Sequence, residues 1–195
     1  MPSQALVVVD MQNAFCHPQG EIFVPEAAEQ LPLVARAIAA ARTADIPVIY
    51  TTVLWRGAND LPLGLRTNDP RWNVDWQNNG SPAEGRWGAE IATELAPADG
   101  DTVLAKPGFV CPGLGDAVTG TGAGTVYLAG TTANNCVYAA ALALFEADLE
   151  VVGISDCISG FGDPMKQPWL QNIAMFLGHL TTLTDYEHNL ATLQV

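Results

Sequence analysis

The chain has 195 residues, of which 49% are hydrophobic and 15% are charged, and its formal net charge at pH 7 is −13. This length can bury a substantial core, and we expect residues 1–195 to form one globular domain. The negative charge argues against nucleic acid and anionic membranes as partners, because both bind basic surfaces.

The N-terminal segment has no basic region before its apolar run, and no apolar stretch approaches the roughly 20 residues of a membrane span. The cysteines show neither a CxxC motif nor metal-ligand spacing, and the histidines are scattered. Neither GxGxxG nor a P-loop is present. We therefore expect a cytoplasmic protein with no metal and no cofactor. Its apolar composition favours a homodimer or homotetramer.

Short apolar runs alternate with helical patterns from the N-terminus onward. Residues 5–9 are an apolar, β-branched run typical of a buried parallel strand. Asp10 follows directly, either as a helix cap or as a catalytic group. Residues 26–44 have helical spacing, and we place the start of the regular helix near Pro32. The next strand is predicted at residues 46–52.

Residues 53–86 form the longest irregular stretch and are rich in Gly, Pro, Asn and Trp. A loop of this length is usually functional or an oligomer contact. Trp55, Trp72 and Trp76 either line a pocket or only hold the loop against the body of the protein.

The middle of the chain continues the alternation. We predict a short helix at residues 87–95, a third strand at 102–105 and another short helix at 113–120. Lys106 follows the third strand, at a place where an ammonium group is commonly just solvated.

Residues 125–154 contain the clearest unit, a strand at 125–129, a polar turn, a helix at 137–147 and a second strand. Cys136 is therefore expected in the first turn of a helix. Unpaired amides and the helix dipole favour a thiolate there, and the same amides could hold an oxyanion. A small buried residue is the other interpretation of this cysteine.

The C-terminal part completes the pattern. Asp156 is interpreted as a cap, residues 160–168 as a loop, residues 171–177 as a helix and residues 179–184 as the last strand. Together these elements predict an α/β fold, a doubly wound three-layer sandwich around a mostly parallel six-stranded sheet.

Asp10, Lys106 and Cys136 each follow a predicted strand. In an open α/β sheet the carboxyl ends of the strands share one edge, and ligands bind there. A carboxylate, an ammonium and a thiol suffice for nucleophilic catalysis, with the lysine stabilising the thiolate and the aspartate accepting its proton.

Several segments carry a resemblance to a known family. They are VVVDMQNAF at 7–15, ADIPVIYTT at 44–52, GRWGAEIATELAPADGD at 85–101, the lysine of VLAKPGF, and LAGTTANNCV at 128–137. In this order and spacing the chain resembles the isochorismatase-like cysteine hydrolases, in their amidohydrolase branch. The resemblance implies a catalytic triad of Asp10, Lys106 and Cys136. It also implies a non-proline cis peptide at Thr131-Thr132 and an oxyanion hole made by the amides of Thr132 and Cys136.

The chain departs from the family pattern around the expected pocket. Ala14 replaces a common acid, residues 110–113 lack the usual aromatic, and Asn135 replaces a common apolar residue. The substrate therefore cannot be copied from a relative. Residues 51–55 lack the Asp-x-His pair of nicotinamidase-type members, which disfavours a metal-dependent nicotinamidase.

Five side chains near the expected site are candidates for substrate binding. They are Gln12, Phe15, Trp76, Trp87 and Asn135. Gln12 either holds Asp10 by a hydrogen bond or is a turn residue, and the aromatic side chains either form the floor of the pocket or serve packing.

Our leading hypothesis is a cysteine hydrolase that cleaves a C–N bond of a small amide, carbamoyl or ureido substrate through a thioester. The alternative is hydrolysis of a vinyl ether such as isochorismate, which needs Asp10 as an acid but no thiol. A third possibility is a non-catalytic binding protein of the same fold.

Overall fold

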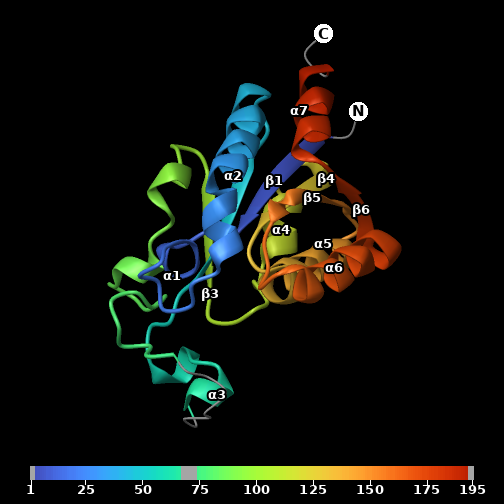
Figure 1. The fold of residues 1–195 in the computed structure, drawn as a ribbon. Coiled ribbons are helices and arrows are strands. Elements are labelled where there is room, and N and C mark those ends of the chain that lie inside the picture. Colours follow the sequence, from blue (N-terminus) through green and yellow to red (C-terminus); the bar gives the residue numbers. More distant parts are fainter. Residues whose placement is uncertain (1–2, 67–73, 193–195) are drawn as a thin grey trace.

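The computed structural model describes residues 3–66 and 74–192, and these form a layered α/β fold (Figure 1). Within them, one six-stranded sheet has the order β3-β2-β1-β4-β5-β6, and every neighbouring pair is parallel. The strands are β1 (Ser3–Val9), β2 (Val48–Val53), β3 (Thr102–Lys106), β4 (Ala123–Gly130), β5 (Glu150–Ile158) and β6 (Gly178–Thr181). This confirms the predicted doubly wound sandwich. All neighbouring strands are parallel, whereas the sequence predicted a mostly parallel sheet. The order reverses between β1 and β4, which is where ligands bind in such sheets.

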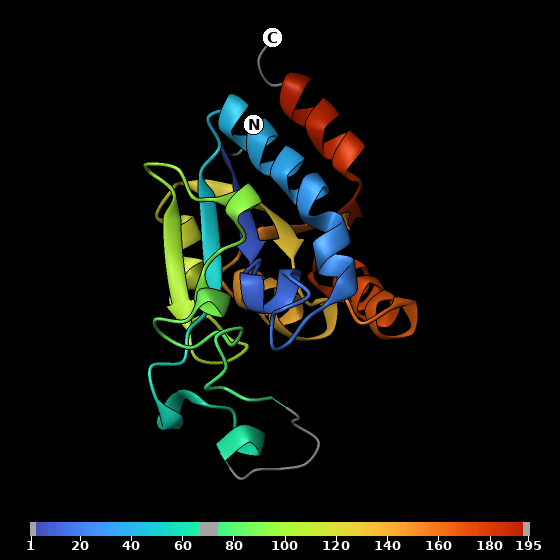
Figure 2. The ribbon, with the colours of Figure 1, turned by 60° about the vertical axis from the view of Figure 1, so that its left-hand side comes forward.

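Helices cover both faces of the sheet, because successive strand residues point to opposite sides. On one face, Leu6 and Val8 pack under α1 (Asn13–Cys16), α2 (Pro25–Thr43) and α7 (Leu183–Thr192). On the other face, Val7 and Val9 pack under α4 (Leu114–Thr119), α5 (Tyr138–Glu146) and α6 (Asp163–Asn172). Figure 2 shows α2 and α7 side by side on their face of the strands.

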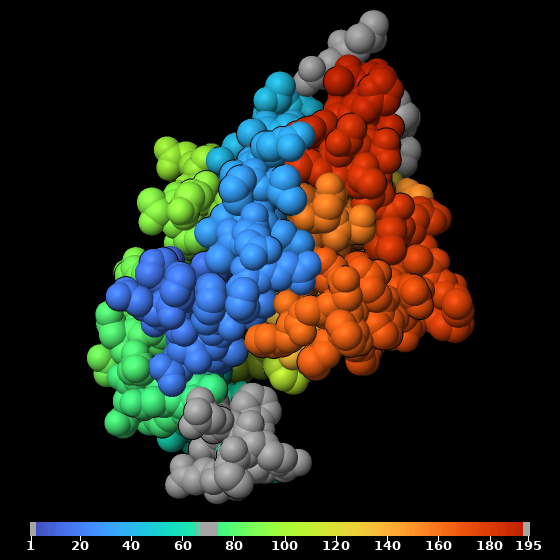
Figure 3. Space-filling model, viewed as in Figure 1, coloured from blue at the N-terminus to red at the C-terminus, as the bar shows by residue number. Residues whose placement is uncertain are grey.

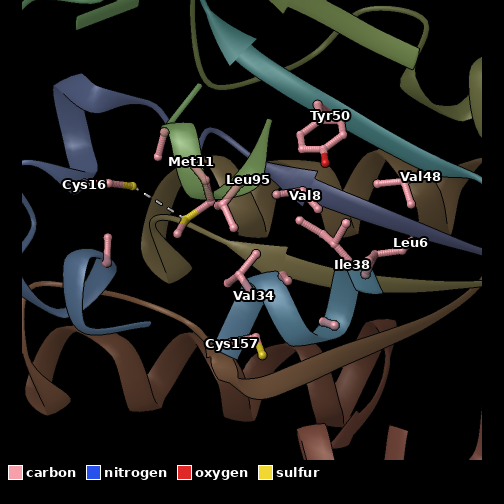
Figure 4. Close-up of a cluster of buried hydrophobic side chains, with 14 of the residues drawn as sticks. Leu6, Val8, Met11, Cys16, Val34, Ile38, Val48, Tyr50, Leu95 and Cys157 are labelled. Atoms are coloured by element: carbon pink, nitrogen blue, oxygen red, sulfur yellow. Dashed lines mark hydrogen bonds between the residues drawn. The ribbon is translucent and has the colours of Figure 1, made fainter. Parts of the chain in front are cut away.

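The core under α2 is continuous with the segment that follows β1. Figure 4 shows Val34 and Ile38 of α2 facing Leu6 and Val8 of β1, with Met11 at the end of this layer. Because the whole run is buried, the chain leaves β1 at Asp10 within the interior rather than at the surface.

Helix α2 begins earlier than predicted. It begins at Pro25, in the first turn, where a missing N–H costs nothing, and Pro32 lies inside it. An interior proline removes one helix hydrogen bond. Here the Pro32 side chain is exposed, while Val34, Ala37 and Ile38 on the buried face hold the helix on the sheet. The prediction of a start near Pro32 was therefore wrong.

The region between β2 and β3 contains little regular structure. The helix predicted at residues 87–95 is instead two 3-10 turns, Trp87–Ala89 and Thr93–Leu95. Gly88 packs so closely on the backbone of Gly80 that a Cβ atom would lie 2.2 Å from a carbonyl oxygen, so this turn is held by a tertiary contact. The long loop also holds a 3-10 turn at Ala58–Asp60 and α3 (Leu63–Arg66).

Two helices near the C-terminus differ from the sequence prediction. The predicted loop at 160–168 contains the start of α6, with Pro164 in its first turn, and a π turn, Ile173–Leu177, follows α6. The predicted strand at 179–184 ends at Thr181, and α7 follows.

A missed capping box explains the error at α7. At the start of α7, the Thr182 hydroxyl donates a hydrogen bond to the Asp185 carboxylate and accepts one from the Asp185 amide. Asp156, which lies within β5 rather than beyond it, accepts a further hydrogen bond from the Leu183 amide.

A partly buried ion pair connects two helices that cover opposite faces of the sheet. Lys166 of α6 contacts Glu26 of α2, which also accepts a hydrogen bond from the Gly160 amide. In Figure 3 the surfaces of α2 (blue) and α6 (orange) meet along this contact. Among the described residues, no helix has the length and apolar character needed to cross a membrane.

Candidate active site

Asp10, Lys106 and Cys136, from the ends of β1, β3 and β4, come together at the carboxyl edge of the sheet. Lys106 Nζ lies 2.7 Å from Asp10 Oδ2 and 3.3 Å from Cys136 Sγ. Because β2 separates β1 from β3, those two strands lie about 10 Å apart, and the lysine side chain has to extend across the end of β2. The structure thus brings together the three side chains that the strand ends predicted.

The Lys106 ammonium has an acceptor for each of its N–H groups. Besides Asp10 and Cys136, it donates to the Gly108 carbonyl oxygen at 2.8 Å. Burial lowers the pKa of Lys106, but the charges and hydrogen bonds of Asp10 and Cys136 outweigh burial, and the net shift is upward. The side chain is therefore a fully engaged cation at neutral pH rather than the solvated group that its position after a strand commonly indicates.

Asp10 is fixed on both carboxylate oxygens. Thr51 Oγ1 donates to Oδ1 at 2.7 Å while Lys106 holds Oδ2, and the Asp10 side chain is fully buried. Its backbone has a φ of +52°, in the left-handed region that Asp tolerates better than most residues. Thr51 was missed by sequence reasoning. The available signal was its place at the end of the strand beside β1.

Cys136 lies in a π turn, Ala133–Val137, between β4 and α5. Burial raises the pKa of its thiol well above the ordinary value, Asp10 raises it further, and Lys106 lowers it. Burial therefore disfavours the thiolate form, which we had predicted from the place of Cys136 in the first turn of a helix. Burial and Asp10 thus favour the neutral form of the Cys136 thiol, and Lys106 opposes them.

The turn before Cys136 is shaped by close contact with β1. Gly130 has a φ of +126°, and a Cβ atom on it would lie 2.1 Å from the Val9 carbonyl oxygen, so only glycine fits. The peptide bond Thr131-Thr132 is cis, as the resemblance implied. The Thr132 amide donates no hydrogen bond to any described residue, which leaves this donor available beside the thiol.

A cavity of about 250 Å³ opens onto the thiol. It is lined by Asp10, Phe15, Ile22, Val24, Val53, Trp55, Pro62, Pro107, Gly108, Phe109, Thr131, Thr132, Asn135, Cys136 and Phe161. Pockets for drug-sized ligands are usually roughly 300–1,000 Å³, so this one suits a smaller molecule.

Several predicted pocket residues contribute to this lining and others do not. Phe15 and Asn135 line it, as does Trp55 of the long loop. Phe109 and Phe161 were missed. Phe109 lies just before the segment 110–113 and supplies an aromatic ring near the position where the sequence was thought to lack one.

Trp76 and Trp87 lie outside the cavity lining. Trp76 is partly buried against the core, and its carbonyl oxygen accepts a hydrogen bond from Ser81. The Trp87 ring packs edge-on against His17. Both therefore have packing contacts rather than contacts with the cavity. Trp72, the third tryptophan of the long loop, lies outside the described residues.

The Gln12 side chain braces neighbouring segments and does not hold Asp10. Its amide nitrogen donates to the Val53 and Ala89 carbonyl oxygens, its amide oxygen accepts from the Val53 amide, and its side chain does not bond Asp10. Among the described residues, the Gln12 side chain holds the end of β2 and the 3-10 turn Trp87–Ala89 against the turn after β1. The cavity does not include it.

We expect Gln12→Ala to destabilise the protein by about 2–4 kcal/mol, because three hydrogen bonds are lost and their partners stay buried. Chemical denaturation measures this change. Gln77→Ala is the matched control, since that side chain is exposed and should change the free energy of unfolding by less than about 0.5 kcal/mol. Equal effects of the two substitutions would contradict the bracing role.

Comparison with known proteins identifies the family of this chain. The family model described as Isochorismatase domain matches residues 4–185, and the chain belongs to this family. The ureidoacrylate amidohydrolase RutB of Methylobacterium radiotolerans is 28% identical over 201 residues, covering 93% of this chain and 77% of the relative. The N-carbamoylsarcosine amidase of an Arthrobacter species is 31% identical over 142 residues, covering 68% of this chain and 50% of the relative.

A solved structure of similar fold is the isochorismatase family protein from Desulfovibrio vulgaris. It superposes with a TM-score of 0.85 at 25% identity, covering 98% of this chain and all of that one. The similarity of fold therefore extends over nearly the whole chain.

Proposed function

We propose that this protein hydrolyses the C–N bond of a small amide, carbamoyl or ureido compound through a thioester on Cys136. The observation that carries the proposal is the position of Lys106, which contacts both Asp10 and Cys136 at the inner end of a cavity. The amidohydrolase names of two relatives support the same bond type.

In the first half of the reaction, Cys136 Sγ attacks the substrate carbonyl carbon as its proton passes to Asp10. The developing oxyanion accepts hydrogen bonds from the amides of Thr132 and Cys136. The C–N bond then breaks, and Asp10 returns the proton to the departing amine. Lys106 keeps its charge throughout and stabilises both the sulfur and the carboxylate.

In the second half, a water molecule replaces the amine. Asp10 takes a proton from the water as its oxygen attacks the thioester carbonyl, and the same amides hold the second oxyanion. Breakage of the C–S bond releases the acid, and the sulfur regains its proton from Asp10. The cycle consumes one water and leaves the enzyme unchanged.

The test is to trap the thioester. Intact-mass analysis after acid quenching of turnover should find an acyl adduct, and peptide mapping should place it on Cys136. The Cys111→Ala variant is the matched control, because Cys111 is also buried but does not line the cavity, and this variant should still form the adduct. Turnover of an amide without an adduct on Cys136 under any quench would contradict the mechanism.

The same measurement separates the rival activities. Hydrolysis of a vinyl ether needs Asp10 to protonate carbon or oxygen, and it forms no thioester. A protein that only binds ligands would show neither turnover nor adduct.

We also propose that the protein acts in the cytoplasm as a homodimer or homotetramer. The four cysteines, all free, suit a reducing compartment. Exposed apolar side chains on α5 and on the π turn after α6 support self-association, among them Phe145, Met175 and Phe176. Sedimentation analysis distinguishes these assemblies from a monomer.

A further inference from the structure

The walls of the cavity are apolar except at the thiol. Its polar members Thr131, Thr132 and Asn135 all come from the turn around Cys136, and Asp10 lies beside them. The rest of the lining is aromatic, aliphatic or proline, apart from Gly108. A ligand in this cavity therefore has one polar end, which faces the sulfur, and an apolar remainder.

The polar end has an unused hydrogen-bonding group. Thr131 Oγ1 is buried and has no partner among the described residues, although Thr131 lines the cavity. A buried hydroxyl without a partner costs free energy, and an amide group of the substrate can both donate to it and accept from it.

The apolar end is rigid on its inner side. Trp55 Nε1 donates to the Pro107 carbonyl oxygen at 3.0 Å, which fixes the indole against the segment after Lys106. Phe15 and Val24 complete this inner wall and are buried. The rings of Phe109 and Phe161 are half-exposed and stand at the opening.

A substrate carboxylate would have no cationic partner in the described lining. Lys106 is the nearest cation, and its three N–H groups already bond Asp10, Cys136 and Gly108. The charged member of the described lining is Asp10, a carboxylate that would repel a second anion. Transfer of an unpaired carboxylate from water into such surroundings is strongly unfavourable.

We infer that the substrate is an uncharged amide or urea with an apolar substituent, and that a compound bearing a carboxylate is rejected. This inference rests on the proposed function and narrows it. It distinguishes the chain from its two named relatives, since ureidoacrylate and N-carbamoylsarcosine are both carboxylates.

Two matched pairs of compounds test the inference. Succinamate is butyramide with its terminal methyl group replaced by a carboxylate. In the same way, 3-ureidopropionate is propylurea with its terminal methyl group replaced by a carboxylate. Binding is measured calorimetrically with Cys136→Ala, and turnover with the wild-type enzyme. We expect the neutral member of each pair to bind at least about tenfold more tightly, a difference of about 1.4 kcal/mol. Equal or tighter binding of the carboxylates, or no binding of either neutral compound, would overturn the inference.

A charge placed at the opening tests the physical cause. Phe109 lines the cavity and is 48% exposed, so Phe109→Arg can be accommodated and should reduce the preference for the neutral member of each pair. Val110→Arg is the matched control, because Val110 is 60% exposed and does not line the cavity. If both variants shift the preference equally, the net charge of the protein and not the cavity wall is responsible, and the inference fails.

The binding measurement keeps this inference separate from the proposed function. If neutral compounds bind selectively but the wild-type enzyme does not cleave them, or if Cys136→Ala cleaves them equally well, the hydrolase mechanism fails while the ligand class stands. If carboxylates bind better and are cleaved only when Cys136 is present, the mechanism stands and the ligand class fails.

Discussion

Replacing Cys136 with alanine is expected to lower kcat/KM for amide hydrolysis by about 10⁴-fold or more, because the nucleophile that forms the covalent intermediate is removed. The cavity and the Asp10–Lys106 ion pair remain, so substrate binding should change little. Steady-state kinetics and calorimetry measure the two effects separately.

The serine variant refines this prediction. Cys136→Ser keeps a hydrogen-bonding group beside Lys106 but presents an oxygen that is far harder to deprotonate than sulfur. We expect activity close to that of the alanine variant. The thiol of Cys136 already has a raised pKa, so in the proposed mechanism the site depends on Asp10 as base and has little capacity to activate a weaker acid. Undiminished hydrolysis by either variant would remove Cys136 from the mechanism.

The second large effect is expected for Asp10→Asn. The amide cannot accept the thiol proton, which should lower kcat by about 10²- to 10⁴-fold. The same substitution leaves the Lys106 ammonium buried without its counter-charge, and breaking a buried pair costs about 3–5 kcal/mol. Asparagine tolerates the positive φ of +52° at this position, so neither effect arises from backbone strain.

The pH dependence of stability provides an independent check on Asp10→Asn. In the wild-type protein the pKa of Lys106 is raised above 10.5, so its contribution to stability is complete below that pH and is lost as pH rises through the folded-state pKa. Without Asp10, we expect burial to outweigh the remaining contribution of Cys136 and to lower the pKa of Lys106. The variant should then gain stability as pH rises toward 10.5, since the unfolded chain binds the extra proton.

Asp148→Asn is the control for this experiment. Asp148 also has a left-handed backbone, with a φ of +62°, but its side chain is exposed. This substitution should leave activity, stability and the pH profile unchanged. If Asp10→Asn behaved like Asp148→Asn, the carboxylate would be neither the base nor the counter-ion of Lys106.

The sequence by itself determined the sheet and the residues at its edge. Short apolar runs such as residues 5–9 are typical of buried parallel strands, and Asp10 follows this run directly. Lys106 ends β3, and Cys136 lies in the turn beyond β4. Because parallel strands end at one edge, their order along the chain was enough to predict that these side chains meet. Local signals also exist for α7, whose capping box at Thr182 was overlooked.

Only the tertiary structure decided what surrounds those residues. Gln12, Trp76 and Trp87 were predicted to bind substrate but have packing or bracing contacts, whereas Phe109 and Phe161 from separate loops form the opening. The protonation of Cys136 was likewise beyond a local argument, since it depends on burial by segments far along the chain. Strand patterns follow from periodicity within a few residues, but cavity walls and pKa shifts depend on long-range packing, which no single segment encodes.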